Sequence, residues 1–293
     1  MDPRLVALLE RVDRLVERLD PLLPVEPPVI DWDTTLAARW QRQGAGGCLM
    51  PLHVNHDLRL DDLIGVDAQR EQLARNTRQF LDGLPANHAL LWGARGTGKS
   101  SLVRALLAEY GSRGLRLVEI ERDHLADLPR LVERLADLSQ RFVVFCDDLS
   151  FEAGEGEYRV LKSVLDGSLE RAPDNVLLYA TSNRRHLVPE RQSDNANWER
   201  VDGELHPSEA VEDKIALSDR FGLWLSFYPF SQEHYLSVVR HWVDSLARQA
   251  GLQWQWDEEL EKAAIRFATG RGNRNGRCAS QFARQWVGLQ LLR

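Results

Sequence analysis

A glycine-rich stretch at residues 93–100 constrains the fold of this 293-residue chain more than any other feature. It reads Gly-Ala-Arg-Gly-Thr-Gly-Lys-Ser and satisfies every fixed position of the phosphate-binding pattern GxxxxGK[ST]. Glycines here let consecutive backbone N–H groups face an anion, because a Cβ atom would block left-handed dihedral angles or close approach. Lys99 would reach the outer phosphates, and Ser100 would offer its hydroxyl to Mg²⁺.

The residues on either side of this loop fit a strand and a helix. The apolar run at residues 89–92 precedes it as a buried strand would. After the loop, Leu102, Val103, Leu106 and Leu107 recur at helical spacing. The phosphates would therefore lie at a helix N-terminus, where backbone N–H groups and the helix dipole favour anions.

Composition narrows the class of protein. The chain is 43% hydrophobic and 28% charged, as in ordinary globular proteins, and its formal net charge is −7. That charge argues against a surface-wide nucleic-acid or membrane binder and leaves room for a local basic groove. The three cysteines have neither disulfide-framework nor zinc-site spacing. With no signal peptide and no apolar run long enough to span a bilayer, we expect a cytoplasmic protein.

The first 57 residues precede the main pattern. Residues 2–19 predict an amphipathic helix that ends at a proline-rich joint, Pro21 to Pro28. Its apolar stripe would pack either on its own chain or on a partner or neighbouring copy. Residues 29–57 have a weak pattern, with Trp32, Trp40 and a run of glycines, and we expect a lead-in that docks on the next domain.

Residues 58–229 alternate between strands and helices. Strands that are mostly apolar along their length, separated by helices, imply a parallel sheet covered on both faces, so we expect a five-stranded α/β domain. Between the last two strands, residues 188–212 form a long polar segment of the kind that is functional or mobile. The expected strands are 89–92, 115–120, 142–146, 176–180 and 223–227.

After Pro229 only helices are expected. Ser231 and Asp257 can each cap a helix, and a last helix starts at about Arg277. Residues 230–293 would thus form a small all-helical lid domain.

Two further strand ends carry chemistry. The third strand runs into Asp147 and Asp148, where the first acid can hold the Mg²⁺ water shell and the second can orient an attacking water. Asp148 is one methylene shorter than the glutamate usual there, so Glu152 is the alternative. The fourth strand ends at Asn183, whose amide can contact the γ-phosphate or the water.

Together with the order of strands and helices, two arginine motifs complete a resemblance. These are Ser-Asp-Arg-Phe-Gly at residues 218–222 and Gly-Asn-Arg-Asn-Gly-Arg at residues 272–277. Over roughly residues 58–293 the chain resembles the AAA+ ATPase superfamily. The sequence around these motifs looks like that of an uncharacterised bacterial ATP-binding subgroup of it.

The resemblance implies roles for individual residues. Asp147 and Asp148 would be the Walker B pair, Asn183 the first sensor, Arg220 an arginine finger for the neighbouring subunit, and Arg277 the second sensor. Arg274 is a rival for that last role, and a surface salt bridge is the alternative for Arg220. Ile64 and Gly65 would line the adenine pocket. The Walker A loop would comprise Gly93, Ala94, Arg95, Gly96, Thr97, Gly98, Lys99, Ser100 and the following Ser101.

The implied function is a Mg²⁺-dependent ATPase that works as a homo-oligomer and remodels or loads a protein or nucleic-acid client. Polypeptide threading is disfavoured, because threading motors of this superfamily carry an aromatic-plus-glycine loop after the second strand and residues 121–126 here contain no Phe, Tyr or Trp. The alternatives are a nucleotide-gated binding module with negligible hydrolysis and a nucleic-acid-directed loader. A small-molecule kinase would have no use for Arg220 or the lid, and the chain lacks the NKxD motif of a GTPase.

Overall fold

The computed structural model describes residues 28–43, 46–54, 58–149, 156–166, 173–183, 199–201, 204–206 and 220–292. The amphipathic helix expected at residues 2–19 and the candidate acid Glu152 lie outside these ranges. Of the polar segment at 188–212, the described part is a short hairpin formed by β7 (Glu199–Val201) and β8 (Glu204–His206).

A seven-stranded sheet forms the centre of the molecule, with strand order β2-β1-β4-β5-β6-β3-β9. All neighbouring strands are parallel except β1 and β2, which form an antiparallel pair. The carboxyl ends of the parallel strands therefore meet at one edge of the sheet. The strands are β1 (Ala37–Gln43), β2 (Gly46–Leu52), β3 (Ala89–Gly93), β4 (Leu115–Glu119), β5 (Arg141–Cys146), β6 (Val176–Ser182) and β9 (Leu223–Phe227).

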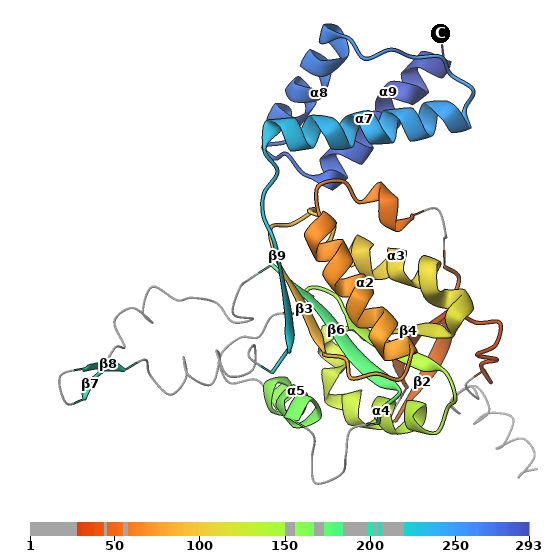
Figure 1. The fold of residues 1–293 in the computed structure, drawn as a ribbon, viewed down its shortest axis with the longest axis vertical. Coiled ribbons are helices and arrows are strands. Elements are labelled where there is room, and N and C mark those ends of the chain that lie inside the picture. Colours follow the sequence, from red (N-terminus) through yellow and green to blue (C-terminus); the bar gives the residue numbers. More distant parts are fainter. Residues whose placement is uncertain are drawn as a thin grey trace, which may run out of the picture.

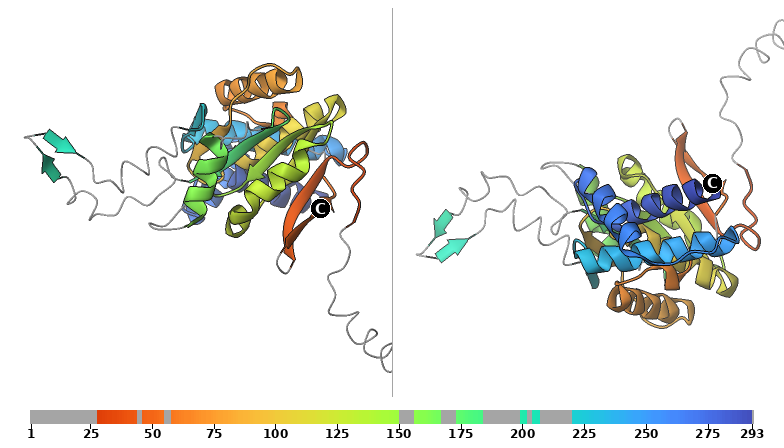
Figure 2. Two further views of the ribbon diagram at one scale, coloured as in Figure 1. Left: turned by 90° about the horizontal axis from the view of Figure 1, so that it is seen from below. Right: turned by 90° about the horizontal axis from the view of Figure 1, so that it is seen from above.

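Helices cover both faces of this sheet, as the unbroken apolar strands predict. On one face α2 (Asp67–Leu81) and α3 (Lys99–Tyr110) bury one set of side chains, and on the other α4 (Leu128–Ala136) and α5 (Gly156–Asp166) bury a second set (Figure 2). Short 3₁₀ turns join these elements: η2 (Leu60–Asp62), η3 (Gly111–Arg113) and η4 (Arg122–Asp127).

The expected number of strands is wrong, because the residues expected to be a lead-in supply two more. Strand β1 pairs in parallel with β4, and the indole of Trp40 is 1% exposed. Its Nε1 donates a hydrogen bond to Asp127 Oδ2 at 3.2 Å. Gly47 leaves room for this ring, since a Cβ there would lie 2.2 Å from it. The sheet thus has seven strands rather than five, and burial of Trp40 makes the hairpin part of the core.

Three C-terminal helices form a separate unit with its own core, at one end of the sheet (Figure 1). We call α7 to α9 the C-terminal helical unit. The expected caps are present: Ser231 Oγ and Asp257 Oδ1 accept hydrogen bonds from the backbone of their first turns, and Asn275 does the same for the last helix. The helices are α7 (Gln232–Gln249), α8 (Glu258–Gly270) and α9 (Gly276–Leu291). The division of the chain at residues 58 and 230 into domains stays a prediction.

Candidate functional site

The phosphate-binding loop connects β3 to α3 at the carboxyl edge of the sheet. Gly93, Gly96 and Gly98 all have positive φ angles, of 131°, 76° and 102°. At Gly93 a Cβ would also lie 1.9 Å from the carbonyl oxygen of Phe227 in β9. All three glycines are thus required by dihedral angle, and Gly93 is required by space as well, which is the local reason that the motif is glycine-rich.

The ammonium group of Lys99 lies inside this loop. Lys99 is 7% exposed, and its Nζ donates hydrogen bonds to the carbonyl oxygens of Gly93 at 2.8 Å and Ala94 at 2.7 Å. A third bond reaches Asn183 Oδ1 at 3.2 Å. Burial lowers the pKa of Lys99 to about 8, and the nearby carboxylates of Asp147 and Asp148 partly oppose that shift. The ammonium group is bonded to neutral carbonyl groups, and an anionic ligand could replace them as its partners.

Three side chains form a hydrogen-bonded cluster where β5 and β6 end. Ser100 Oγ donates to Asp147 Oδ1 at 2.6 Å, and Thr181 Oγ1 donates to the same oxygen at 2.5 Å. Thr181 Oγ1 in turn accepts from the backbone N–H of Asp148 at 2.9 Å. Thr181 therefore orients Asp147 toward the hydroxyl of Ser100.

This cluster fits a magnesium ion. Within the described ranges no three His, Cys, Asp or Glu side chains gather into a group that could hold a metal by themselves. Mg²⁺ does not need such a group, because it keeps several waters and takes one or two protein oxygens plus substrate phosphates. Ser100 and Asp147, with hard oxygens in direct contact beside the phosphate loop, are such a pair.

Asp148 has an unusual backbone. Its φ angle is 56°, and among the residues that the structure describes it is the one non-glycine with a positive φ. Aspartate tolerates this left-handed conformation better than most residues. Asn183 Nδ2 donates a hydrogen bond to Asp148 Oδ1, and the guanidinium of Arg95 lies 3.7 Å from Oδ2. The carboxylate of Asp148 is therefore engaged with the first-sensor candidate and the phosphate loop.

A cavity of about 1170 Å³ lies between the sheet edge and the C-terminal helical unit. It brings together most of the residues that the sequence singled out. Five others among the described residues, Gly65, Gly93, Ala94, Arg220 and Arg274, do not line it. The predicted residues in its wall are Ile64, Arg95, Gly96, Thr97, Gly98, Lys99, Ser100, Ser101, Asp147, Asp148, Asn183 and Arg277.

Part of the cavity wall is apolar. Ile64 lines it, as do Val238 and Trp242 of α7, and Ile64 packs against the core of the C-terminal helical unit. Gly65 stands behind Ile64 and has a φ of 75°, and a Cβ there would meet the ring of His234 at 2.1 Å. His234 Nε2 forms a hydrogen bond of 2.8 Å with the carbonyl oxygen of Ile64. Gly65 thus permits a contact between the two units.

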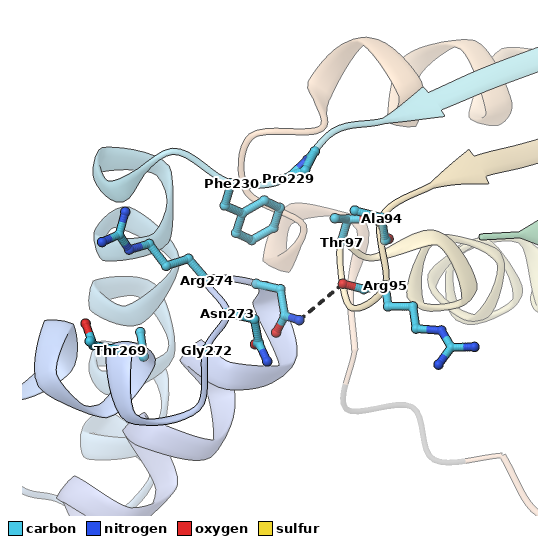
Figure 3. A pocket seen from close by; sticks show the side chains of 11 residues that line it. Ala94, Arg95, Thr97, Pro229, Phe230, Thr269, Gly272, Asn273 and Arg274 are labelled. Atoms are coloured by element: carbon cyan, nitrogen blue, oxygen red, sulfur yellow. Dashed lines mark hydrogen bonds between the residues drawn. The ribbon is translucent and has the colours of Figure 1, made fainter. Parts of the chain in front are cut away.

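The two rival arginines of the C-terminal helical unit face different spaces. Arg277, in the first turn of α9, lines the large cavity with Lys99 and Asp147. Arg274 lines a smaller cavity of about 650 Å³, which shares Arg95, Thr97 and Phe230 with the large one. Figure 3 shows Phe230 facing the loop in this smaller cavity, with the guanidinium groups of Arg95 and Arg274 pointing in opposite directions.

Arg220 lies away from this chain's own cavity. It precedes Phe221, which is 1% exposed in the core under α4 and α5. Burial of Phe221 fixes the backbone on one side of Arg220.

Several residues of the cavity wall were missed in the sequence. Arg39 of β1 lies 2.8 Å from Glu119 at the end of β4, and both line the cavity. No local pattern singles out Arg39, because its strand was not expected. Arg284 lies seven residues after Arg277 on α9, so its place on the same helical face was readable from the spacing.

Comparison with solved structures places this fold among known ones. The RuvB Holliday junction branch migration motor of Thermotoga maritima matches at 15% identity and a TM-score of 0.50, over 78% of this chain and 64% of that one. The ORC1 protein of Aeropyrum pernix, solved in complex with DNA, matches at 17% identity and a TM-score of 0.51, over 76% and 61%. This chain thus spans less than two thirds of the length of either protein. The AAA+ fold expected from the sequence is confirmed.

Sequence comparisons give one negative and one positive result. No curated protein sequence matches this one. In the described part of the chain, no helix combines the length and apolarity needed to cross a bilayer, and the expected cytoplasmic location stays a prediction. A family model covers residues 33–290, nearly the whole described chain including the β1–β2 hairpin. This chain therefore belongs to the family described as protein of unknown function (DUF815).

Proposed function

We propose that this protein is a Mg²⁺-dependent ATPase that assembles into a homo-oligomer and uses hydrolysis to remodel or load a partner. The observation that carries the proposal is the contact between Ser100 of the phosphate loop and Asp147 at the end of β5, 2.6 Å apart, beside the buried Lys99. The likeness to solved AAA+ structures supports the nucleotide-binding part.

The wall of the large cavity contains a group for each part of the reaction. Backbone N–H groups of residues 96–100 and the ammonium group of Lys99 would bind the phosphates. Mg²⁺ held by Ser100 and Asp147 would supply charge neutralisation at the β- and γ-phosphates. Arg277 would add positive charge from the C-terminal helical unit.

An acid has to orient the attacking water, and two candidates remain. Asp148 lines the cavity and contacts Asn183, so the pair could hold a water between them and the γ-phosphate. Glu152 is the alternative, with a longer side chain four residues further along. Since Arg277 belongs to the helical unit but lines the nucleotide cavity, loss of the γ-phosphate would release that unit as a lid moving against the sheet.

The position of Arg220 favours an assembled enzyme, because Arg220 does not line its own subunit's cavity. If it completes the neighbour's site, turnover per subunit should rise with protein concentration. Arginine fingers contribute about 10³ to 10⁵ in rate, so Arg220→Ala should lose on the order of 10³ in turnover at high concentration. A matched control is Arg248→Ala, because Arg248 is exposed on α7 and pairs with Asp244 one turn away.

The measurement is steady-state ATP turnover against protein concentration for the three proteins. A rate per subunit that is independent of concentration, or an Arg220→Ala protein as active as the Arg248→Ala control, would remove the assembly claim. Nucleotide binding by each subunit would survive that result.

The geometry of Asp148 favours a second candidate, a nucleotide-gated binding module with negligible hydrolysis. Its carboxylate is short, engaged by Asn183 and Arg95, and held on a left-handed backbone. A basal rate near background that neither Asp148→Asn nor Glu152→Gln lowers further would support this module. A rate that either variant lowers at least tenfold would support the ATPase.

A further inference from the structure

The first residues of α9 contact the phosphate loop directly. Asn275 Nδ2 donates a hydrogen bond to the carbonyl oxygen of Arg95 at 3.1 Å, drawn as the dashed line in Figure 3. The backbone N–H of Gly276 donates to the carbonyl oxygen of Gly96 at 2.8 Å. Two adjacent carbonyl groups of the loop are thus held by two adjacent residues of the C-terminal helical unit. We call this pair of bonds the loop contact.

Asn275 uses both ends of its amide. Its Oδ1 accepts a hydrogen bond from the backbone N–H of Cys278 at 2.8 Å and so caps α9. Since Oδ1 must face that N–H donor, the Nδ2 group is turned toward Arg95. One side chain therefore caps the N-terminus of α9 and donates a hydrogen bond to the phosphate loop. Aspartate has no amide donor for that bond, and serine lacks the second polar group.

Peptide geometry gives the loop contact a consequence on its far side. The carbonyl of Arg95 shares a planar trans peptide with the N–H of Gly96, and the carbonyl of Gly96 shares one with the N–H of Thr97. In such a plane the C=O and N–H bonds point in opposite directions. Holding both carbonyls toward α9 therefore turns the N–H groups of Gly96 and Thr97 away from it. Both residues line the large cavity, where phosphate would bind.

The two backbones meet where neither carries a side chain. A Cβ on Gly96 would lie 2.5 Å from Asn275 Nδ2, and a Cβ on Gly276 would lie 3.2 Å from the carbonyl oxygen of Gly96. The loop contact thus needs glycine at position 96 for space, in addition to its φ of 76°. The second of these glycines lies outside the phosphate-loop motif, 180 residues further along the chain.

We propose that Asn275 is a positioning residue that orients the phosphate-binding N–H groups of Gly96 and Thr97 through the loop contact. The inference rests on the proposed nucleotide binding and adds a path between the phosphate loop and the helical unit that does not pass through Arg277. Because coupling is reciprocal, bound phosphate favours the docked position of α9 by the same factor that docking favours phosphate.

The test compares two substitutions of helix caps. Asn275→Ser keeps a favoured N-cap side chain but removes the amide donor to Arg95 without adding charge. Asp257→Ser is the matched control, because Asp257 caps α8 of the same unit through Leu260 and lies in neither cavity wall. ADP binding in Mg²⁺ is measured by calorimetry, and thermal unfolding is measured in parallel.

We expect Asn275→Ser to weaken ADP binding about three- to tenfold, the effect of one neutral hydrogen bond of about 0.5–1.5 kcal/mol. Asp257→Ser should bind ADP as the wild type does, with a similar unfolding temperature. If Asn275→Ser does not fold, Asn275→Asp serves in its place, since it caps equally well and also lacks the donor; its loss should be at least as large. A folded Asn275 variant with wild-type affinity, or an equal loss in Asp257→Ser, would overturn the role of Asn275 alone. Wild-type protein that takes up no ADP would overturn the proposed function as well.

Discussion

The two walls of the large cavity, where we propose that nucleotide binds, are built differently. On the sheet side, Lys99, Ser100 and Asp147 are held by hydrogen bonds of 2.6 to 2.8 Å within one fold, above strands that are almost fully buried. On the other side, the C-terminal helical unit has its own core and meets the sheet side through the packing of Ile64 against that core and through isolated hydrogen bonds. Those described are from His234, His241, Asn275 and Gly276.

This difference indicates how binding and motion are divided. The sheet wall should receive phosphate with little movement of its backbone, because its groups belong to a single core, although Lys99 has to exchange its bonds to loop carbonyl groups for bonds to phosphate. The helical wall can dock or withdraw by exchanging a few hydrogen bonds with water, each contributing about 1 kcal/mol. Changes in the sheet wall should therefore alter nucleotide affinity most, and changes in the helical wall should alter turnover or coupling.

The largest effect is expected for Lys99→Met in the sheet wall. Loss of its ammonium group should weaken ATP and ADP binding by about 100-fold or more, because charge-assisted hydrogen bonds to phosphate contribute about 1.5–3 kcal/mol each. The measurement is anisotropy of a fluorescent ADP. Lys262→Met is the control, since Lys262 pairs with Glu258 on α8 and lines neither cavity. Equal ADP affinity of the Lys99→Met and Lys262→Met proteins would contradict the role of the sheet wall in nucleotide binding.

Arg277→Ala in the helical wall should act on turnover instead. We expect a fall of about 30-fold in kcat with a change in ADP affinity of threefold or less, since Arg277 would stabilise charge that develops in the transition state. Arg266→Ala is the control, because Arg266 is exposed on α8 and lines neither cavity. A loss of affinity as large as that of Lys99→Met would mean that the two walls share one role.

The pH dependence of binding should report Lys99. Its pKa is lowered to about 8 by burial, and phosphate binds the protonated form. ADP affinity should be constant below pH 8 and fall by up to about tenfold per unit above it. The lowered pKa of Lys99 also affects stability. Between pH 8 and about 10.4, Lys99 holds its proton in the unfolded chain but loses it in the native one, so the unfolding free energy should rise with pH. Both trends should vanish in Lys99→Met.

The smallest effect is expected where α7 meets the turn before α2. His241 Nε2 lies 3.0 Å from Asp62 Oδ1, and both side chains are partly exposed. Removing either partner should change ADP affinity by about threefold or less. A double-mutant cycle of His241→Ala and Asp62→Ala measures their coupling. Coupling as strong as the effect of Lys99→Met would mean that the helical unit is as firmly fixed as the sheet.

The sheet wall was largely predictable because its residues are adjacent in sequence or follow apolar strands. Residues 93–100 define their own turn, and Asp147 and Asn183 come directly after buried strands whose carboxyl ends meet. Their roles in catalysis stay predictions. The β1–β2 hairpin was not predicted as part of the sheet, because its place there involves a contact of Trp40 with Asp127 of η4, 87 residues away.

The helical wall was predictable in its elements but not in its contacts. Caps at Ser231 and Asp257 are local signals and were expected. That Asn275 reaches Arg95, or that His234 fits over Gly65, depends on how two separately packed units meet. No local sequence pattern predicts contacts of this kind between two units.

Calorimetric titration of the folded wild-type chain with ATP in Mg²⁺ tests the central claim most directly. We expect saturable binding at one site per chain that is lost when Mg²⁺ is chelated or Lys99 is replaced. Absence of heat from binding on folded protein, or uptake unchanged in Lys99→Met, would contradict the account.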